Sequence, residues 1–408
     1  MSTEGPGGAS WRRAWGLRVF ADARFVRLAL ALALAIALAY RASQFLAFLS
    51  APQWGYDFSA YWLAARHLLG GEGIYSAAQL AGPYVPQGQF LYLYPPFLAV
   101  LVVPLAWLSP DSYGPAMAAW ALIGAIVAAA VVIGLGRLEG VARDPVRTAF
   151  LLAGAFAFPP LVAELVLGNV HVLLLGLLAL AWWGVRAGSG RGEAVAGIAI
   201  GIAALIKLFP AVVLLWLLLT GRWRAVAWGI GAVVAGAVLT VPITGIDPWL
   251  QYPRVLLNLG SPADLTDALA PSVWLAVVLP PLAARVAVLV VGLALVAWAA
   301  RRLDERASFG IAVAASVLMA PALFQHYLAL MLLPLLLGLP LALAGPPVAR
   351  LGLAASYLAM WPGQQPLLGA AAWVLNRAIP TLGALGVPAT LAAWGGRSAS
   401  EPGTGQAA

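Results

Sequence analysis

Chemically active side chains are rare in the hydrophobic part of this sequence, and Asp57 is the first carboxylate within it. It stands in an aromatic stretch at residues 53–62, with the sequence QWGYDFSAYW. A carboxylate in such a place can accept a proton from a hydroxyl group as a general base. Aspartate is also a good helix N-cap, so Asp57 could instead cap a helix that begins at Phe58. One carboxylate can fill both roles.

Lys207 is the only lysine among 23 basic residues, and it is flanked by Ile206 and Leu208 with no charged neighbour nearby. A lysine at the end of an apolar helix can extend its ammonium group to the membrane surface. The alternative is a buried ammonium that faces an anion such as a lipid phosphate. Ionisable groups inside an apolar body are costly and mark functional sites, so we favour the anion site.

A second group of polar residues surrounds breaks between apolar runs. Glu164, Asn169 and His171 lie on either side of one such break, and Gln325 and His326 begin another segment. Irregular backbone in a membrane is tolerated only against protein or a cavity, so these residues could contact a sugar or a phosphate. The alternative for the first group is an ordinary helix turn, and for His326 a structural role at a helix start.

Aromatic residues are concentrated between residues 51 and 94, which hold six of the eleven tyrosines. Such residues form belts at the level of the lipid headgroups, but they can also stack on sugar rings. We expect sugar or acceptor contacts from Tyr56, Tyr61, Trp62 and Tyr94. Arg66 lies either on a solvated helix face or at the mouth of the pocket, where it could contact a phosphate.

Several kinds of chemistry find no support in the sequence. There are no cysteines and only three histidines, so we expect no disulfide and no metal site. No P-loop and no glycine-rich dinucleotide motif is present, which argues against a nucleotide substrate. The sequence therefore predicts no cofactor and no nucleic-acid partner.

The composition predicts an all-α, polytopic membrane protein. Of 408 residues, 63% are hydrophobic and 9% are charged, and mean hydropathy is +0.92. About 20 apolar residues cross the hydrocarbon core as a helix, and runs of this kind recur from residue 28 to residue 394. We expect about 11 to 13 membrane segments.

The arginines predict three regions and one orientation. Residues 1–27 form a basic arm that the positive-inside rule places in the cytoplasm, residues 28–394 form the membrane domain, and residues 395–408 form a disordered tail. Residues 51–94 then form an external loop that carries an amphipathic helix in the interface plane. The number of crossings between residues 95 and 147 stays open, because Arg137, Arg143 and Arg147 conflict with an external placement. The composition is typical of a high-GC bacterium, so we expect a bacterial plasma membrane with the site facing the periplasm or the exterior.

Three elements in order resemble glycosyltransferase family 87, a family of polyprenyl-phosphate-mannose-dependent mannosyltransferases with GT-C architecture. The first is YDFxxYWxAAR at residues 56–66, followed by YPPF at residues 94–97. The second is GNVH at residues 168–171, and the third is LIKLFP at residues 205–210. The chain departs from the family at Asn169 and His171, where Gln and Asn are usual, and at Gln325-His326.

The resemblance implies an inverting transfer of a sugar from a polyprenyl-phosphate donor to a glycolipid or glycan acceptor. Asp57 would be the general base. Lys207, with His326 and Arg66, would contact the donor phosphate. Donor or acceptor contacts would come from the four aromatic residues named above and from a polar set: Glu164, Asn169, His171 and Gln325. Neither a metal nor a nucleotide is required, because a lipid phosphate is already an adequate leaving group.

Two other functions are compatible with the residues alone. Transporters and lipid flippases also have broken helices and isolated charges, although many contain an internal repeat that we do not find here. A structural or regulatory membrane subunit is the other possibility, and in that case Asp57 and Lys207 would be dispensable.

Overall fold

The protein folds as an assembly of helices. A computed structural model describes residues 54–82, 91–259, 269–361 and 373–396, together with scattered positions between residues 28 and 47. Within these residues regular structure is helical apart from one isolated bridge between Leu303 and Gly396. This confirms the all-α prediction. The basic arm and most of the first predicted span, residues 28–50, lie outside the described residues.

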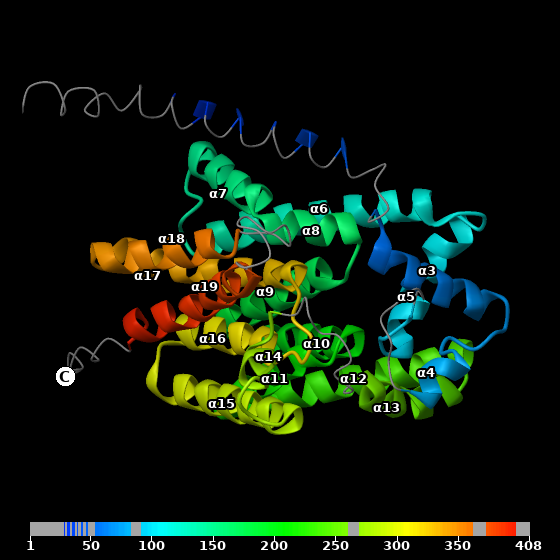
Figure 1. The fold of residues 1–408 in the computed structure, drawn as a ribbon. Coiled ribbons are helices and arrows are strands. Elements are labelled where there is room, and N and C mark those ends of the chain that lie inside the picture. The colour runs from blue at the N-terminus through cyan, green and yellow to red at the C-terminus, as the bar shows by residue number, and fades with distance from the viewer. Residues whose placement is uncertain are drawn as a thin grey trace, which may run out of the picture.

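One end of the molecule is built from short helices that lie across the others (Figure 1). They are α3 (Tyr56–Leu69), α4 (Ala77–Ala81), α5 (Pro96–Leu108) and α13 (Asp247–Leu259). Helix α3 packs along α5, and Trp62 Nε1 donates a hydrogen bond to the Ser109 carbonyl just beyond α5 at 3.0 Å. Asn258 of α13 reaches back to the Gln79 carbonyl of α4 at 2.7 Å. We call this the α3 end.

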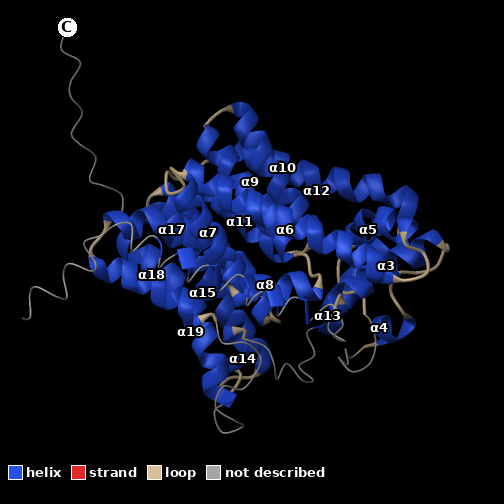
Figure 2. Cartoon of the chain, turned by 90° about the horizontal axis from the view of Figure 1, so that it is seen from above, coloured by secondary structure: helices blue, strands red, loops and turns tan. Residues whose placement is uncertain are grey.

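The remaining helices pack side by side to form a bundle, as the two views at right angles show (Figures 1 and 2). In chain order they are α6 (Tyr113–Leu138), α7 (Pro145–Ala157), α8 (Pro159–Leu167), α9 (His171–Ala187), α10 (Gly190–Ile206), η1 (Phe209–Ala211), α11 (Val212–Leu219), α12 (Trp223–Thr244), the short α14 (Pro271–Leu275), α15 (Pro281–Arg302), α16 (Glu305–Leu318), η2 (Gln325–Met331), α17 (Leu332–Ala344), α18 (Pro347–Ala359) and α19 (Trp373–Trp394).

The opposite end of the bundle is marked by buried charges and flanking arginines. The Glu139 carboxylate follows α6 and lies 2.6 Å from Arg306 Nε of α16. It also accepts a hydrogen bond from Trp182 Nε1 of α9 at 2.7 Å. Arg222, which precedes α12, pairs with Glu305 at the start of α16. These contacts bring several helix ends together, and we call this the arginine end.

Helix α6 answers the question that the sequence left open between residues 95 and 147. It begins beside α3, where Tyr113 Oη donates to the Trp54 carbonyl at 3.4 Å, and it ends at Glu139 on the arginine end. Helix α5, in contrast, both begins and ends near α3. The chain therefore crosses the bundle once in this region, along α6, and Arg137 lies at the arginine end with the other flanking arginines.

The helices are suited to a membrane, but few reach full spanning length. Among the described residues, α6, α12, α15 and the continuous segment Gln325–Ala344 are long and apolar enough to cross a bilayer. The pair α7 and α8, bent by 62°, would make a fifth span. This is fewer than the 11 to 13 segments expected, because most of residues 28–50 lie outside the described residues and several apolar runs form shorter helices, such as α5, α9 and η1 with α11. The protein is nevertheless a multi-pass membrane protein.

Small residues set the position of α10 between its neighbours. A methyl group on Gly197 would lie 2.0 Å from the Ala225 carbonyl of α12, and one on Gly184 of α9 would lie 2.5 Å from the Gly192 carbonyl of α10. Such close backbone contact is how membrane helices pack tightly. As a result α10 is held firmly along its length, and its last turn delivers Lys207 to the α3 end.

The predicted tail boundary needs a small correction. Gly395 was expected to begin a disordered tail, but its carbonyl accepts a hydrogen bond from the Asp304 backbone N–H at 2.9 Å. The chain is therefore packed through Gly396, because these residues close the start of α16. Residues 397–408 lie outside the described part of the chain.

Candidate active site

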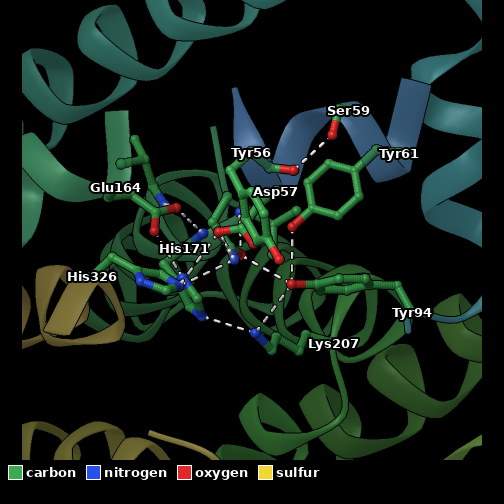
Figure 3. Close-up of polar contacts among 12 residues, drawn as sticks. Tyr56, Asp57, Ser59, Tyr61, Tyr94, Glu164, His171, Lys207 and His326 are labelled. Carbon is green, nitrogen blue, oxygen red and sulfur yellow. Dashed lines mark hydrogen bonds and ion pairs between the residues drawn. The ribbon is translucent and has the colours of Figure 1, made fainter. Parts of the chain in front are cut away.

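The fold gathers polar side chains from five separate segments at the α3 end (Figure 3). Asp57 comes from the first turn of α3, Tyr94 from the segment before α5, and Asn169 from the turn between α8 and α9. Lys207 immediately follows α10, and His326 lies in η2. Each therefore comes from a helix end or a break, where side chains can converge without disturbing the packing of a helix interior.

Two glycines with left-handed backbone bring Asp57 next to Asn169. Gly55 has φ of 69° and donates its N–H to the Val166 carbonyl of α8 at 2.9 Å. Gly168 has φ of 70°, and a methyl group there would lie 2.6 Å from Met117 Sδ. Only glycine adopts this conformation readily, so both positions allow α3 and the α8–α9 turn to approach closely.

The predicted capping role of Asp57 is wrong. Helix α3 begins two residues earlier than expected, its N-cap is Gly55, and no side chain caps it. The Asp57 carboxylate is instead directed to Asn169, whose Nδ2 donates to Oδ2 at 2.9 Å. The acid thus lies inside the first turn of α3, where the helix dipole favours a negative charge.

Asn169 is the centre of the polar network. Its Nδ2 contacts both Asp57 Oδ2 and His326 Nε2, the latter at 3.2 Å. Its Oδ1 accepts from Tyr94 Oη at 3.1 Å and from the Val170 backbone N–H at 2.7 Å. The amide donates on one side and accepts on the other, so its orientation is determined by its partners. Because amide nitrogen can only donate, His326 Nε2 accepts this bond.

Tyr94 connects this network to Lys207. Its hydroxyl accepts from Tyr61 Oη at 2.9 Å and from Lys207 Nζ at 3.4 Å while donating to Asn169. The Lys207 ammonium also lies 3.9 Å from the centre of the Tyr327 ring. An aromatic face attracts a cation through its quadrupole, so the tyrosines help to hold the ammonium in a largely apolar setting.

Behind Lys207 lies a fully buried acid–imidazole pair. His171 Nδ1 is 2.9 Å from Glu164 Oε2, and the side chains are 0% and 1% exposed. His171 Nε2 lies 3.0 Å from Lys207 Nζ. Glu164 and His171 have almost no surface for a ligand, so the expected direct contacts of these two residues with donor or acceptor are not supported by their burial.

Burial sets the protonation chemistry of Asp57. Helix α3 is not among the membrane-spanning candidates, and the Asp57 side chain is 22% exposed. Loss of solvent raises the pKa of this carboxyl to about 6, although the Asn169 hydrogen bond and the Lys207 charge oppose the rise. A carboxyl with such a pKa is ionised at neutral pH and is a stronger base than an ordinary aspartate.

Contrary to the assumption made from the sequence, two of the three histidines, His171 and His326, lie together. Ligand atoms of Glu164, His171 and His326 lie within 4.8 Å of one another, a spacing that could hold a metal ion. Here, however, Lys207 Nζ already contacts His171 Nε2, and Glu164 accepts hydrogen bonds from the α9 backbone. This donor set fits an ammonium group better than a metal cation, because a second positive charge would lie beside Lys207.

Other predicted residues have contacts or positions that differ from those of the five residues above. Trp62 uses its indole N–H on the Ser109 carbonyl and thereby joins α3 to the end of α5. Arg66 is nine residues beyond Asp57, about 13 Å along the helix axis. Tyr56 is 51% exposed, with its carbonyl bonded to Ser59, and Gln325 is 9% exposed.

Sequence reasoning missed two aromatic residues beside Lys207. Tyr327 contacts the ammonium, as described, and Phe209 has its ring centre 5.8 Å from Nζ. Tyr327 directly follows His326, and Phe209 lies two residues after Lys207. The signal was therefore present, but an aromatic residue next to a polar one is common in membrane helices and carries little information alone.

The chain is similar to known proteins over much of its length. Over 225 residues the chain is 28% identical to a Mycobacterium tuberculosis protein named polyprenol-phosphate-mannose-dependent alpha-(1-2)-phosphatidylinositol mannoside mannosyltransferase. The match covers 52% of this chain and 51% of that protein, so the chain spans about half the length of this relative. Residues 92–334 match the model of glycosyltransferase family 87, a stretch that includes Asn169, Lys207 and His326 but not Asp57. Because this match covers more than half of the sequence, the chain belongs to glycosyltransferase family 87.

Proposed function

We propose that this membrane glycosyltransferase moves mannose from a polyprenyl-phosphate donor to a lipid-linked or cell-envelope glycan. The donor class is supported by family membership and by the name of the mycobacterial relative. The acceptor class is broader than that name, because the chain matches only about half of that relative. A membrane-embedded donor also suits a site at the end of an apolar helix bundle, where a lipid can approach laterally.

In the proposed reaction Asp57 is the general base. Its carboxylate takes the proton from the acceptor hydroxyl while that oxygen attacks the anomeric carbon of the donor. The bond between the anomeric carbon and the phosphate oxygen breaks at the same time, and its electron pair leaves with the polyprenyl phosphate. A single displacement inverts the configuration of the sugar. Lys207 lies where its ammonium can stabilise the negative charge on the leaving phosphate.

The observation that carries this proposal is the separation of two opposite charges by neutral groups. Asp57 and Lys207, both among the described residues, form no direct ion pair. Instead Asn169 contacts the carboxylate at 2.9 Å, Tyr94 contacts the ammonium at 3.4 Å, and a hydrogen bond of 3.1 Å joins the two neutral side chains. A carboxylate bound directly to an ammonium would be a poor base, whereas this arrangement leaves each group able to act on a ligand.

The proposed location is the plasma membrane of a bacterium, with the α3 end facing the periplasm or the exterior. The flanking arginines support this orientation, since basic residues are retained on the cytoplasmic side. Arg137, Arg222 and Arg306 all lie at or beside the arginine end, opposite Asp57. Family membership favours the transferase over the transporter alternative.

The decisive experiment measures transfer by purified protein in lipid nanodiscs. Radiolabelled polyprenyl-phosphate-mannose is incubated with lipid-linked and soluble glycan acceptors, and the anomeric configuration of the product is determined. We expect transfer with inversion, and a loss of at least about 100-fold in Asp57→Asn, because general base catalysis contributes on that order. Unchanged transfer in Asp57→Asn would eliminate Asp57 as the base. No transfer from any polyprenyl-phosphate sugar would eliminate the donor class.

A further inference from the structure

The buried pair Glu164 and His171 is too deep to touch a ligand, yet it contacts the proposed phosphate-binding lysine. We propose that Glu164 and His171 are positioning residues that direct the Lys207 ammonium toward the leaving phosphate of the donor. This proposal rests on the proposed function and extends it to a buried support behind the site. It assigns these two residues a role different from the direct ligand contacts expected from the sequence.

Glu164 is anchored by the backbone of the next helix. Its Oε1 accepts hydrogen bonds from the N–H groups of His171 at 2.5 Å and Val172 at 3.3 Å. These are the first two residues of α9, whose N–H groups have no partner within the helix. A carboxylate in this place also interacts favourably with the helix dipole. The acid therefore has one oxygen held in place and the other, Oε2, directed at the His171 ring.

The chain of contacts determines which nitrogen of His171 carries the proton. A lysine ammonium has three donors and no acceptor, so His171 Nε2, at 3.0 Å from Lys207 Nζ, must accept. Nδ1 then carries the hydrogen and donates to Glu164 Oε2 at 2.9 Å. The imidazole is neutral in this arrangement, and the carboxylate holds it in the tautomer that Lys207 needs.

Lys207 requires such support because its helix does not direct it. The residue follows the last turn of α10 with extended backbone, φ of −155° and ψ of 136°, and its side chain has a flexible four-carbon stem. One N–H is directed to His171 and a second to Tyr94 Oη at 3.4 Å. Among the described residues no hydrogen-bond acceptor is found for the third N–H, although the Tyr327 ring lies 3.9 Å from Nζ, and we assign this N–H to the ligand. Two fixed acceptors thus determine the direction of the donor that would meet the phosphate.

Two substitutions of His171 separate its two contacts. The side-chain amide of Asn places its N–H near the position of Nδ1, so His171→Asn can still donate to Glu164 but is too short to reach Lys207. His171→Gln places an amide oxygen near the position of Nε2, so it can still accept from Lys207. A third variant is Glu164→Gln. Its amide NH₂ group would face His171 Nδ1–H, so two donors would point at each other. This favours the tautomer with the proton on Nε2, which cannot accept from Lys207.

The assay measures steady-state kinetics for the donor and inhibition by the product polyprenyl phosphate, with thermal unfolding as a check on folding. For His171→Asn and Glu164→Gln we expect about a 10-fold or greater fall in kcat/KM, by analogy with the loss of residues that orient metal ligands. The inhibition constant for polyprenyl phosphate should rise in parallel. His171→Gln should recover most of both values, which a purely structural role would not predict.

Glu139→Gln is the matched control, because it alters another buried carboxylate bonded to a ring N–H, but at the arginine end. It should lower the unfolding temperature and leave the kinetic constants of the folded protein unchanged.

Equal kinetics for His171→Asn, His171→Gln and the wild type would overturn the positioning role while leaving the transferase proposal intact. A wild-type protein that transfers no sugar would instead defeat the proposed function itself. Recovery of His171→Asn by added divalent metal, but not of the wild type, would also overturn the positioning role in favour of a metal site.

Discussion

The protonation of Asp57 leads to a quantitative prediction for the pH dependence of transfer. Burial raises the pKa of this carboxyl to about 6, and only the ionised form can accept the acceptor proton. The carboxyl would be about 90% ionised at pH 7 and about 10% ionised at pH 5. The value of kcat/KM should therefore fall roughly 10-fold between pH 7 and pH 5, and about 10-fold for each further unit.

The assay is the initial rate of transfer in nanodiscs between pH 4.5 and pH 8, with donor and acceptor below their KM values so that the rate reports the free enzyme. Asn169→Ala provides a directional test, because it removes a hydrogen bond that favours the ionised carboxylate. Its acid limb should move to higher pH. A midpoint near 4, the ordinary value for aspartate, or an Asn169→Ala profile moved to lower pH, would refute the reasoning. Activity regained on return to pH 7 controls for acid unfolding.

Three further outcomes follow from the packing. Gly168→Ala should lower stability by about 1–2 kcal/mol and reduce transfer, because a methyl group there would meet Met117 Sδ at 2.6 Å; thermal unfolding and kcat measure the two effects. Arg306→Met should destabilise the protein by about 3 kcal/mol by leaving Glu139 unpaired, and an unchanged unfolding temperature would contradict this. Trp62→Phe should keep kcat/KM within about 2-fold, since its indole bonds to backbone, and a large rise in acceptor KM would restore its predicted contact with a ligand.

Much of the fold was predictable from the sequence, because a bilayer permits few solutions. Long apolar runs must form helices in hydrocarbon, and α12, Trp223–Thr244, is one such helix. The path through residues 95–147 was not predictable. Helix α5 is as apolar as a spanning helix, and only its packing against α3 shows that it stays at one end. Hydropathy measures the preference of a segment for an apolar environment, and both lipid and protein provide one.

The candidate site, like the fold, was predictable in part from the sequence. Asp57 and Lys207 could be singled out from the sequence because an isolated charge in an apolar chain needs a physical reason, and their types suggest a base and an anion partner. Their relation could not be deduced, since Asn169 and Tyr94, which lie between them, come from distant segments. Sequence spacing says nothing about contacts that depend on how several helix ends meet.

The sequence by itself determined that this is a helical membrane protein, because so apolar a composition requires a lipid environment. It also identified a carboxylate and a lone ammonium group that are available for chemistry. Only the tertiary structure decided that Asp57 is not a helix cap and that Glu164 and His171 form a buried pair in contact with Lys207. The physical reason is that burial and hydrogen-bond direction are properties of packed neighbours. A residue's type gives its possible partners, and the fold selects among them.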